Sequence, residues 1–222
     1  MAQENHRPSG LQPRIGGAAW ASTVVYFIGQ AVAQAAWSTP YSLIDNRISD
    51  LGNTACGRAP ANVYICSPLH AVMNASFVLT GILLLAGLYL TRRIWPRGRL
   101  TTWGLAFLAV TGIGTVLVGL APENVNVPLH LVGALNIPCG NIALLLLGLA
   151  NRRLRPGIAR LTLVLSAVGF LGMLGGPALI ALTGHGGGLA ERLALYPAIV
   201  WTVLLGLSVL RVRRTDPRAR TT

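Results

Sequence analysis

Six apolar stretches, each long enough to cross a lipid bilayer, limit what this chain can fold into. They cover residues 15–37, 69–91, 100–121, 127–150, 161–183 and 189–210. A helix needs about 20 apolar residues to cross the hydrocarbon core. The first five stretches contain no Asp, Glu or Arg, whereas a soluble helical bundle needs a charged face on each helix. We therefore predict an all-α polytopic membrane protein with six transmembrane helices in one bundle.

The arginines predict how this bundle is oriented. The chain has 18 basic residues, all arginine, and six acidic residues, for a net charge of +12. Fifteen arginines fall before the first stretch, in the second and fourth connections, and after the last stretch, while Arg47, Arg58 and Arg192 fall on the other side. The positive-inside rule then places both termini in the cytoplasm. The basic excess is thus a topology signal and an attraction to anionic lipid, and we expect no nucleic-acid partner.

The domain prediction follows from these boundaries. We expect a disordered cytoplasmic tail over 1–14, one membrane domain over 15–211 with outer loops at 38–68, 122–127 and 184–188, and a basic cytoplasmic tail over 212–222. A cleaved signal peptide is the alternative for the first stretch. That stretch exceeds the usual 7–15 apolar residues and contains Gln30 and Gln34, so we predict a retained helix.

Acids and histidines gather on the predicted outer side. His70 and His130 each follow Pro-Leu at the start of an apolar stretch, sixty residues apart, with Ser67 and Asn126 as candidate helix caps. The same offset aligns Arg92-Arg93 with Arg152-Arg153. Two helical hairpins related as a parallel repeat would explain this spacing, and chance alignment of leucine-rich helices is the alternative.

Polar side chains at membrane depth usually face the bundle interior, so we predict an outward-facing polar pocket. The candidate catalytic residues are Asp50, His70, Glu123 and His130. The candidate substrate-binding residues are Asp45, Asn46, Ser49, Asn74, Asn136, Glu191 and Arg192. The alternative is that the histidines and amides serve as interhelical hydrogen bonds. Leu43, Ile44, Ile48 and Leu51 suggest that the first outer loop folds back onto the bundle.

The cysteines agree with this sidedness. Cys56 and Cys66 bracket part of the first outer loop, and an oxidising exterior favours a disulfide between them. Cys139 lies within the fourth stretch, as a small packing residue. Pro138, one residue earlier, removes a helix hydrogen bond in that stretch.

Several motifs carry a family resemblance. "NRISDLGNTAC", "CSPLHAVMN", "GLAPENVNVPLHLVGA" and "GLAERLALYP" resemble the bacterial membrane family known as domain of unknown function 998, over nearly the whole chain. The resemblance implies a six-helix protein of unsettled activity in a bacterial cell membrane. The "ISDLG" loop is also weakly similar to the DRAM and Sfk-like eukaryotic membrane proteins, some linked to lipid handling, and this transfers no catalytic residue.

Three functions fit these residues, each with membrane lipids or a hydrophobic small molecule as the partner. The first is lipid modification, in which Asp50 or Glu123 forms an acid–base pair with His70 or His130. A zinc-assisted version would use His70, His130 and His185 as ligands. Ser49 as a nucleophile lacks a Gly-x-Ser-x-Gly setting.

The second function is metal-free isoprenoid cyclisation. Asp50 or Glu123 would donate the proton, and Trp37, Tyr196 and Trp201 would stabilise a carbocation. An interfacial aromatic belt is the alternative role for these rings. The third function is non-catalytic, either lipid binding or assembly with another membrane protein.

Overall fold

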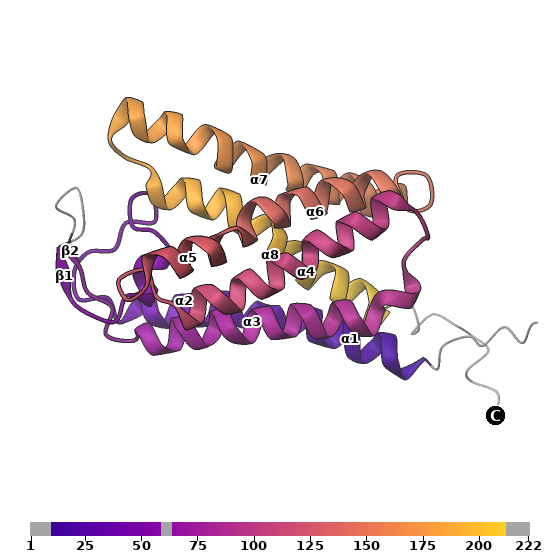
Figure 1. The fold of residues 1–222 in the computed structure, drawn as a ribbon, viewed down its shortest axis with the longest axis horizontal. Coiled ribbons are helices and arrows are strands. Elements are labelled where there is room, and N and C mark those ends of the chain that lie inside the picture. Colours follow the sequence, from indigo (N-terminus) through magenta and orange to yellow (C-terminus); the bar gives the residue numbers. More distant parts are fainter. Residues whose placement is uncertain (1–9, 59–63, 212–222) are drawn as a thin grey trace, which may run out of the picture.

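The computed structural model describes residues 10–58 and 64–211, which form six helical spans along a common axis (Figure 1). The spans are α1 (Leu11–Ala21) with α2 (Val25–Ala35), α3 (His70–Thr91), α4 (Arg99–Leu120), α5 (Val127–Ala134) with α6 (Asn136–Asn151), α7 (Pro156–Thr183) and α8 (Gly187–Arg211). Each is long and apolar enough to cross a membrane. The predicted six-helix membrane fold is confirmed.

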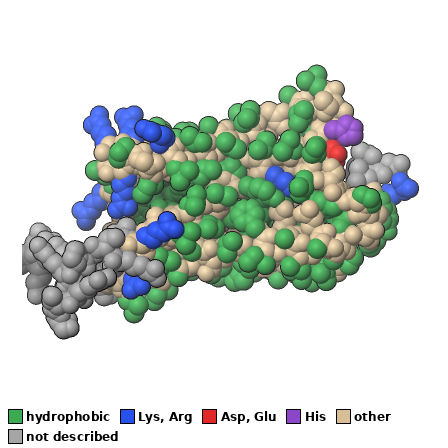
Figure 2. Space-filling model, turned by 180° about the vertical axis from the view of Figure 1, so that it is seen from behind, with side chains coloured by type: hydrophobic (Ala, Val, Ile, Leu, Met, Phe, Trp, Pro, Cys, Tyr) green, Lys and Arg blue, Asp and Glu red, His purple; other side chains and the backbone are tan. Residues whose placement is uncertain are grey.

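The spans follow one another around the bundle in sequence order. Each packs against the next, and α8 packs back against α1, which closes the ring. The start of α1, the end of α8 and the α3–α4 and α6–α7 connections lie at one end (Figure 1). We call it the arginine-rich end, since Arg92, Arg93, Arg97, Arg99, Arg152, Arg153, Arg155 and Arg160 lie there. The opposite, carboxylate end carries Asp45, Asp50, Glu123 and Glu191. In Figure 2 most of the visible basic side chains, in blue, lie at one end, and the acidic and histidine side chains, in red and purple, lie at the other.

Short irregular elements shape the spans and their connections. The 3₁₀ turn η1 (Ser22–Val24) joins α1 to α2, and η4 (Arg92–Ile94) follows α3. The fourth span is interrupted at Leu135, three residues before Pro138. Pro138 has no N–H to donate to the carbonyl of Ala134. At the interruption itself, the Leu135 N–H donates to the Val132 carbonyl, three residues earlier. The interruption agrees with the hydrogen bond that Pro138 was predicted to remove.

The disulfide between Cys56 and Cys66 is present, as predicted. It flanks a small antiparallel pair of strands, β1 (Gly57–Arg58) and β2 (Tyr64–Ile65). The bond ties the far part of the first loop together just before α3 begins. Cys139 is partly buried in α6.

Two local predictions need correction. Helix α1 begins at Leu11, so residues 11–14, which we had assigned to a disordered tail, are helical. The rest of that tail and the tail over 212–222 lie outside the described residues. Ser67 does not cap α3 with its side chain, because its hydroxyl donates to the carbonyl of Leu51. Asn126 does cap α5, accepting a hydrogen bond from the Leu129 N–H.

Close backbone contact joins the first and last spans. Gly17 of α1 and Gly206 of α8 face each other, and a Cβ at Gly206 would lie 2.5 Å from the carbonyl oxygen of Gly17. Small residues commonly allow such close packing between membrane helices. By contrast, a Cβ at Gly175 of α7 would make only an ordinary contact, 3.7 Å from Leu171.

We expect Gly206→Ala to lower stability by about 1–3 kcal/mol, because the added methyl group forces α8 away from α1. The measurement is the thermal midpoint in mild detergent. Gly175→Ala is the matched control, and it should be neutral or stabilising by up to about 1 kcal/mol, since alanine favours a helix more than glycine does. Equal midpoints for the two variants would show that α1 and α8 are not closely packed.

Candidate functional site

The first outer loop covers part of the carboxylate end. We call residues 41–53 the cap. It contains the 3₁₀ turn η2 (Ser49–Gly52), and its Ile48 and Leu51 are fully buried in a cluster with Tyr26 and Phe77. The loop therefore folds back onto the bundle, as its apolar residues predicted. Leu43 and Ile44, in contrast, are exposed, so half of the predicted apolar set faces outward.

The start of α8 fastens this cap. The Glu191 carboxylate accepts a hydrogen bond from the Ile48 N–H at 2.6 Å. The Arg192 guanidinium, only 6% exposed, donates to the carbonyl oxygens of Leu43 and Asn46 and to the Tyr41 hydroxyl. Both predicted substrate-binding residues of α8 thus already bind the cap. Buried backbone carbonyls need such partners, which makes this contact important for stability.

Asp50 lies in the cap as a buried carboxyl group. It is 7% exposed, and one of its oxygens accepts a hydrogen bond from the Arg47 N–H at 2.8 Å. Burial raises the pKa of Asp50 to about 6; the Arg47 N–H opposes this shift, and the negative charge of Glu123 adds to it. Glu123 itself forms an ion pair with Arg47 at 3.7 Å. Asp50 therefore interacts electrostatically with both Glu123 and Glu191.

A tyrosine cluster lies among the helices next to the cap. Gln30 and Tyr196 exchange hydrogen bonds of 2.6 and 2.9 Å. The Tyr26 ring stacks edge-on against Phe77 and Tyr196. Its buried hydroxyl has no hydrogen-bond partner among the residues that the structure describes, and it lies within electrostatic range of Glu191. We did not predict Tyr26 or Tyr41 as site residues. Tyr26 lies in the middle of the first span and Tyr41 lies in the loop that follows it, and neither position gave a signal for a site in the sequence.

Burial also affects Tyr41, which lies in the cap itself. It raises the pKa of the Tyr41 hydroxyl to about 12, although the neighbouring Arg192 opposes the shift. At neutral pH this hydroxyl is protonated. It accepts a hydrogen bond from Arg192 and donates one to the carbonyl oxygen of Arg47. Tyr41 therefore links α8 to the turn that holds Asp50.

The histidines do not pair with the predicted catalytic carboxylates. His70 places its Nδ1 on the Ser67 carbonyl oxygen at 3.0 Å, and His130 places its Nδ1 on that of Ala121 at 2.8 Å. Within residues 10–58 and 64–211, neither histidine bonds to Asp50 or Glu123. The His70 imidazole thus binds backbone just before its own span, whereas the His130 imidazole binds backbone at the end of α4. The predicted carboxylate–histidine pairs are thus not formed.

His185 has a different partner from the other two histidines. It contacts Asp45 at 3.2 Å, and both side chains are largely exposed. The Gly186 N–H, together with Ser42 and His185, lowers the pKa of Asp45. Across the described part of the chain, no three His, Cys, Asp or Glu side chains form a group that could hold a metal ion. The predicted zinc set of His70, His130 and His185 is therefore not assembled.

The predicted polar residues divide between two depths. Asn46 accepts from the Ser42 N–H within the cap, and Asn74 of α3 donates to the Gly52 carbonyl. Ser49 is also buried in the cap. Asn136 lies apart from them, within the fourth span, where it donates to Thr115 of α4. For Asn136 the interhelical hydrogen bond that we had kept as an alternative is the observed role.

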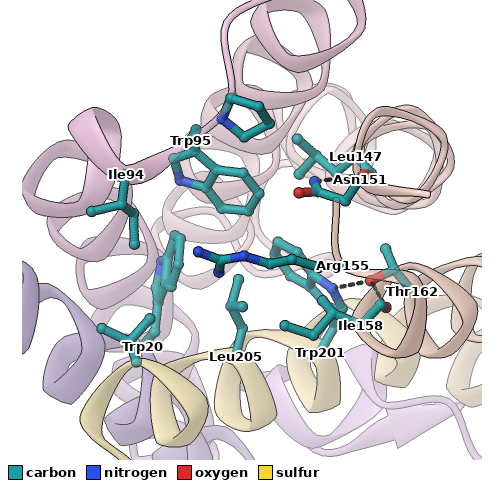
Figure 3. Close-up of a pocket in the computed structure, with 12 residues that line it drawn as sticks. Trp20, Ile94, Trp95, Leu147, Asn151, Arg155, Ile158, Thr162, Trp201 and Leu205 are labelled. Atoms are coloured by element: carbon teal, nitrogen blue, oxygen red, sulfur yellow. Dashed lines mark hydrogen bonds between the residues drawn. The ribbon is translucent and has the colours of Figure 1, made fainter. Parts of the chain in front are cut away.

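A separate cleft lies at the arginine-rich end, far from the cap (Figure 3). Trp20, Trp95 and Trp201 line it together with Arg155, and no carboxylate contributes to it. Of the rings considered for isoprenoid cyclisation, Trp201 lies here, whereas Trp37 contacts Tyr41 of the cap and Tyr196 lies beneath it. The structure therefore does not bring the proposed proton donors and the three rings together.

We expect Arg192→Gln to destabilise the protein by about 3 kcal/mol, because buried carbonyls of the cap lose a charged donor. Arg47→Gln is the matched control, since Arg47 is 55% exposed and its ion pair should be worth about 1 kcal/mol or less. Thermal midpoints in detergent measure both effects. A midpoint for Arg192→Gln as high as that for Arg47→Gln would contradict the fastening role.

Comparison with known proteins identifies a family. A search of curated proteins and a search of solved structures gave no match. A family model described as "Protein of unknown function (DUF998)" matches residues 20–208, which reach from the end of α1 to the last turn of α8 and include the cap. The resemblance found in the sequence motifs is thus confirmed, and the chain belongs to the DUF998 family of proteins of unknown function.

Proposed function

We propose that this protein binds and modifies a lipid or isoprenoid by acid–base chemistry at the cap, with Asp50 as the proton donor or acceptor. The observation that supports this is a buried Asp50 carboxyl group with a pKa of about 6. A general acid or base works best when its pKa lies near the working pH. At pH 7 about one Asp50 in ten would be protonated, compared with about one in a thousand for an ordinary aspartate.

The other residues of the site have supporting roles in this proposal. Glu123 keeps negative charge near Asp50 and so favours its protonated form. Arg192 and Tyr41 position the cap that carries Asp50. His70 and His130 act on the backbone around the site rather than on the substrate.

The position of the cap suggests the class of substrate. It closes an end of an apolar bundle, and its Leu43 and Ile44 side chains are exposed next to polar groups. An amphiphile whose head lies at the membrane surface would meet both kinds of group. In this proposal the carboxylate end faces away from the cytoplasm of a bacterial cell, which the arginine distribution supports through the positive-inside rule.

A non-catalytic role is the second candidate, and one observation favours it. The hydrogen bonds of Glu191 and Arg192 are already used to hold the cap backbone and Tyr41. A cap held in this way could serve as a rigid surface for a lipid or a protein partner. The two candidates predict different effects on cellular lipids when the titratable carboxyl group of Asp50 is removed and the fold is retained.

We expect Asp50→Asn to remove a pH dependence of stability. The pKa of Asp50 rises from 3.8 to about 6 on folding, so the folded state binds a proton more tightly than the unfolded state does. Stability should therefore fall by about 3 kcal/mol as the pH rises from about 4 to about 6. The variant lacks this loss, and it should melt at a higher temperature than wild type at pH 7 and at a similar temperature below pH 4. Detergent-solubilised protein melted from pH 4 to pH 8 provides the measurement.

The functional test uses the same variant in cells. Lipid extracts are compared between cells that produce wild type, Asp50→Asn or Asp45→Asn at equal levels of folded protein. Asp45 is the matched control, since it is an exposed cap carboxylate with a lowered pKa. The proposal expects one lipid species to change with wild type and Asp45→Asn, and not with Asp50→Asn. Identical lipid profiles for all three would favour the non-catalytic role.

A further inference from the structure

A groove runs along one face of α7 at the arginine-rich end. Its lining residues on this helix include Pro156, Arg160, Leu163 and Ala167, which recur at intervals of three and four. Residues at this spacing lie on the same face of a helix. Arg152, from the turn between α6 and α7, lines the same groove. We call this hollow the α7 groove.

The α7 groove has room for a ligand. Its volume is about 420 Å³, and ligand pockets commonly have volumes of about 300–1,000 Å³. The small side chains of Ala159 and Ala167 leave this space beside Leu163 and Val164. The tryptophan-lined cleft at the same end differs, because its free space is about 30 Å³, roughly the volume that one water molecule occupies in the liquid. Of these two hollows, the α7 groove is the one that can hold an acyl chain.

The α7 groove opens toward lipid rather than toward the interior of the bundle. Helix α7 lies along one edge of the bundle (Figure 1). In its apolar stretch 22% of the residues are buried, compared with 39–44% in the other five spans. Val164 and Ala167 are exposed at the groove itself. In a membrane such a surface is covered by acyl chains, which are as apolar as leucine. The surroundings of the groove therefore favour an occupant with an apolar chain.

Two arginines at one end of the α7 groove are available to bind an anion. Arg152 and Arg160 are exposed, and neither side chain forms a hydrogen bond or an ion pair with the residues that the structure describes. The four acids within the described ranges lie at the opposite end of the bundle. A guanidinium binds phosphate oxygens through paired hydrogen bonds, and basic pockets at membrane helices bind anionic head groups. The groove therefore favours a ligand with a negatively charged phosphate.

The length of the α7 groove matches one leaflet of a bilayer. The axial rise of a helix from Pro156 to Ala167 is about 16 Å, and half of a hydrocarbon core is about 15 Å thick. Arg160 lies about 6 Å along the axis from Pro156, and its long side chain can extend back toward the head groups. A lipid with its phosphate at the arginines would thus place one acyl chain along the groove within its own leaflet.

We propose that the α7 groove binds one anionic diacyl phospholipid from the leaflet at the arginine-rich end. Its phosphate lies between Arg152 and Arg160, and one acyl chain lies along Leu163, Val164 and Ala167. The positive charge of a choline head group would be repelled by the arginines, and a free phosphate would leave the apolar part of the groove empty. The site lies at the opposite end from Asp50, and it does not depend on the function proposed for the cap.

Native mass spectrometry tests the proposal directly. The full-length protein in mild detergent is mixed with equal amounts of phosphatidylglycerol and phosphatidylcholine that carry the same acyl chains, and the two complexes are distinguished by mass. Arg152→Gln/Arg160→Gln removes the two cations of the groove. Arg97→Gln/Arg99→Gln is the matched control, because it removes the same charge from exposed positions in the α3–α4 connection, at the same end.

A second pair of variants tests the chain-binding part of the groove. Ala167→Phe fills the groove without changing the charge of the protein. Ala178→Phe is its control, since Ala178 is also exposed on α7 but does not line the groove. Thermal midpoints without added lipid show that each variant is folded.

We expect the first bound lipid of wild type to be phosphatidylglycerol rather than phosphatidylcholine. Arg152→Gln/Arg160→Gln should lower the ratio of the two complexes by about tenfold, since charged hydrogen bonds to the phosphate are lost. Ala167→Phe should lower the binding of this first phosphatidylglycerol several-fold. Both control variants should bind it as wild type does, and excess glycerol phosphate should not displace it.

Four outcomes would overturn this inference. Equal binding of the two lipids by wild type would show that the head group is not recognised. An equal effect of the two double arginine variants would show that the total charge of this end, not the groove, attracts the lipid. Unchanged binding by Ala167→Phe, or displacement by glycerol phosphate, would show that no acyl chain occupies the groove. A lipid-free dimer that Ala167→Phe disrupts would show that a second copy of the chain occupies it.

Discussion

The buried guanidinium of Arg192 is the interaction on which the carboxylate end depends. It donates to two cap carbonyls and to Tyr41, and Glu191 holds the next turn through the Ile48 N–H. These bonds fix the cap against α8, and the fixed cap keeps water from Asp50. The raised pKa of Asp50 is thus a consequence of how α8 begins, since burial is its main cause. A mutation at Arg192 should change the chemistry of Asp50 without touching it.

The two ends of the bundle differ in how their few charged residues are compensated. At the carboxylate end, Asp50, Glu191 and Arg192 are bonded within the cap and α8, and the cap closes over them. At the arginine-rich end, the Arg155 side chain has no hydrogen bond or ion pair among the described residues, and it lies beside Trp20, Trp95 and Trp201. Buried charges must be compensated inside the protein, whereas charges at the level of lipid head groups can be compensated by the membrane. The first arrangement fixes the charged groups in place, and the second leaves charge available to lipid head groups.

The sequence was sufficient to predict the six spans, because a bilayer requires long apolar helices and few other folds meet that requirement. Local signals also predicted that the Asn126 side chain bonds the first turn of α5 and that Cys56 and Cys66 form a disulfide. The partners of His70 and His130 were not, since both bind backbone carbonyls that no residue pattern reveals. The role of Tyr26 was hidden for a similar reason, because a tyrosine in the middle of an apolar span looks the same in sequence whether it faces lipid or a buried carboxylate.

Asp50 and Glu191 act on the same turn of the cap, which connects acid–base chemistry to the helices. Asp50 accepts from the Arg47 N–H and Glu191 from the Ile48 N–H, so two carboxyl groups hold successive amides. Adding a proton to Asp50 weakens its bond to the Arg47 amide and relieves its repulsion of Glu191. The second change acts on α8, because Glu191 belongs to that helix. Because folding raises the pKa of Asp50, the protonated form is the one that stabilises the folded cap. A substrate that takes the Asp50 proton would therefore also loosen the cap, and return of the proton would tighten it.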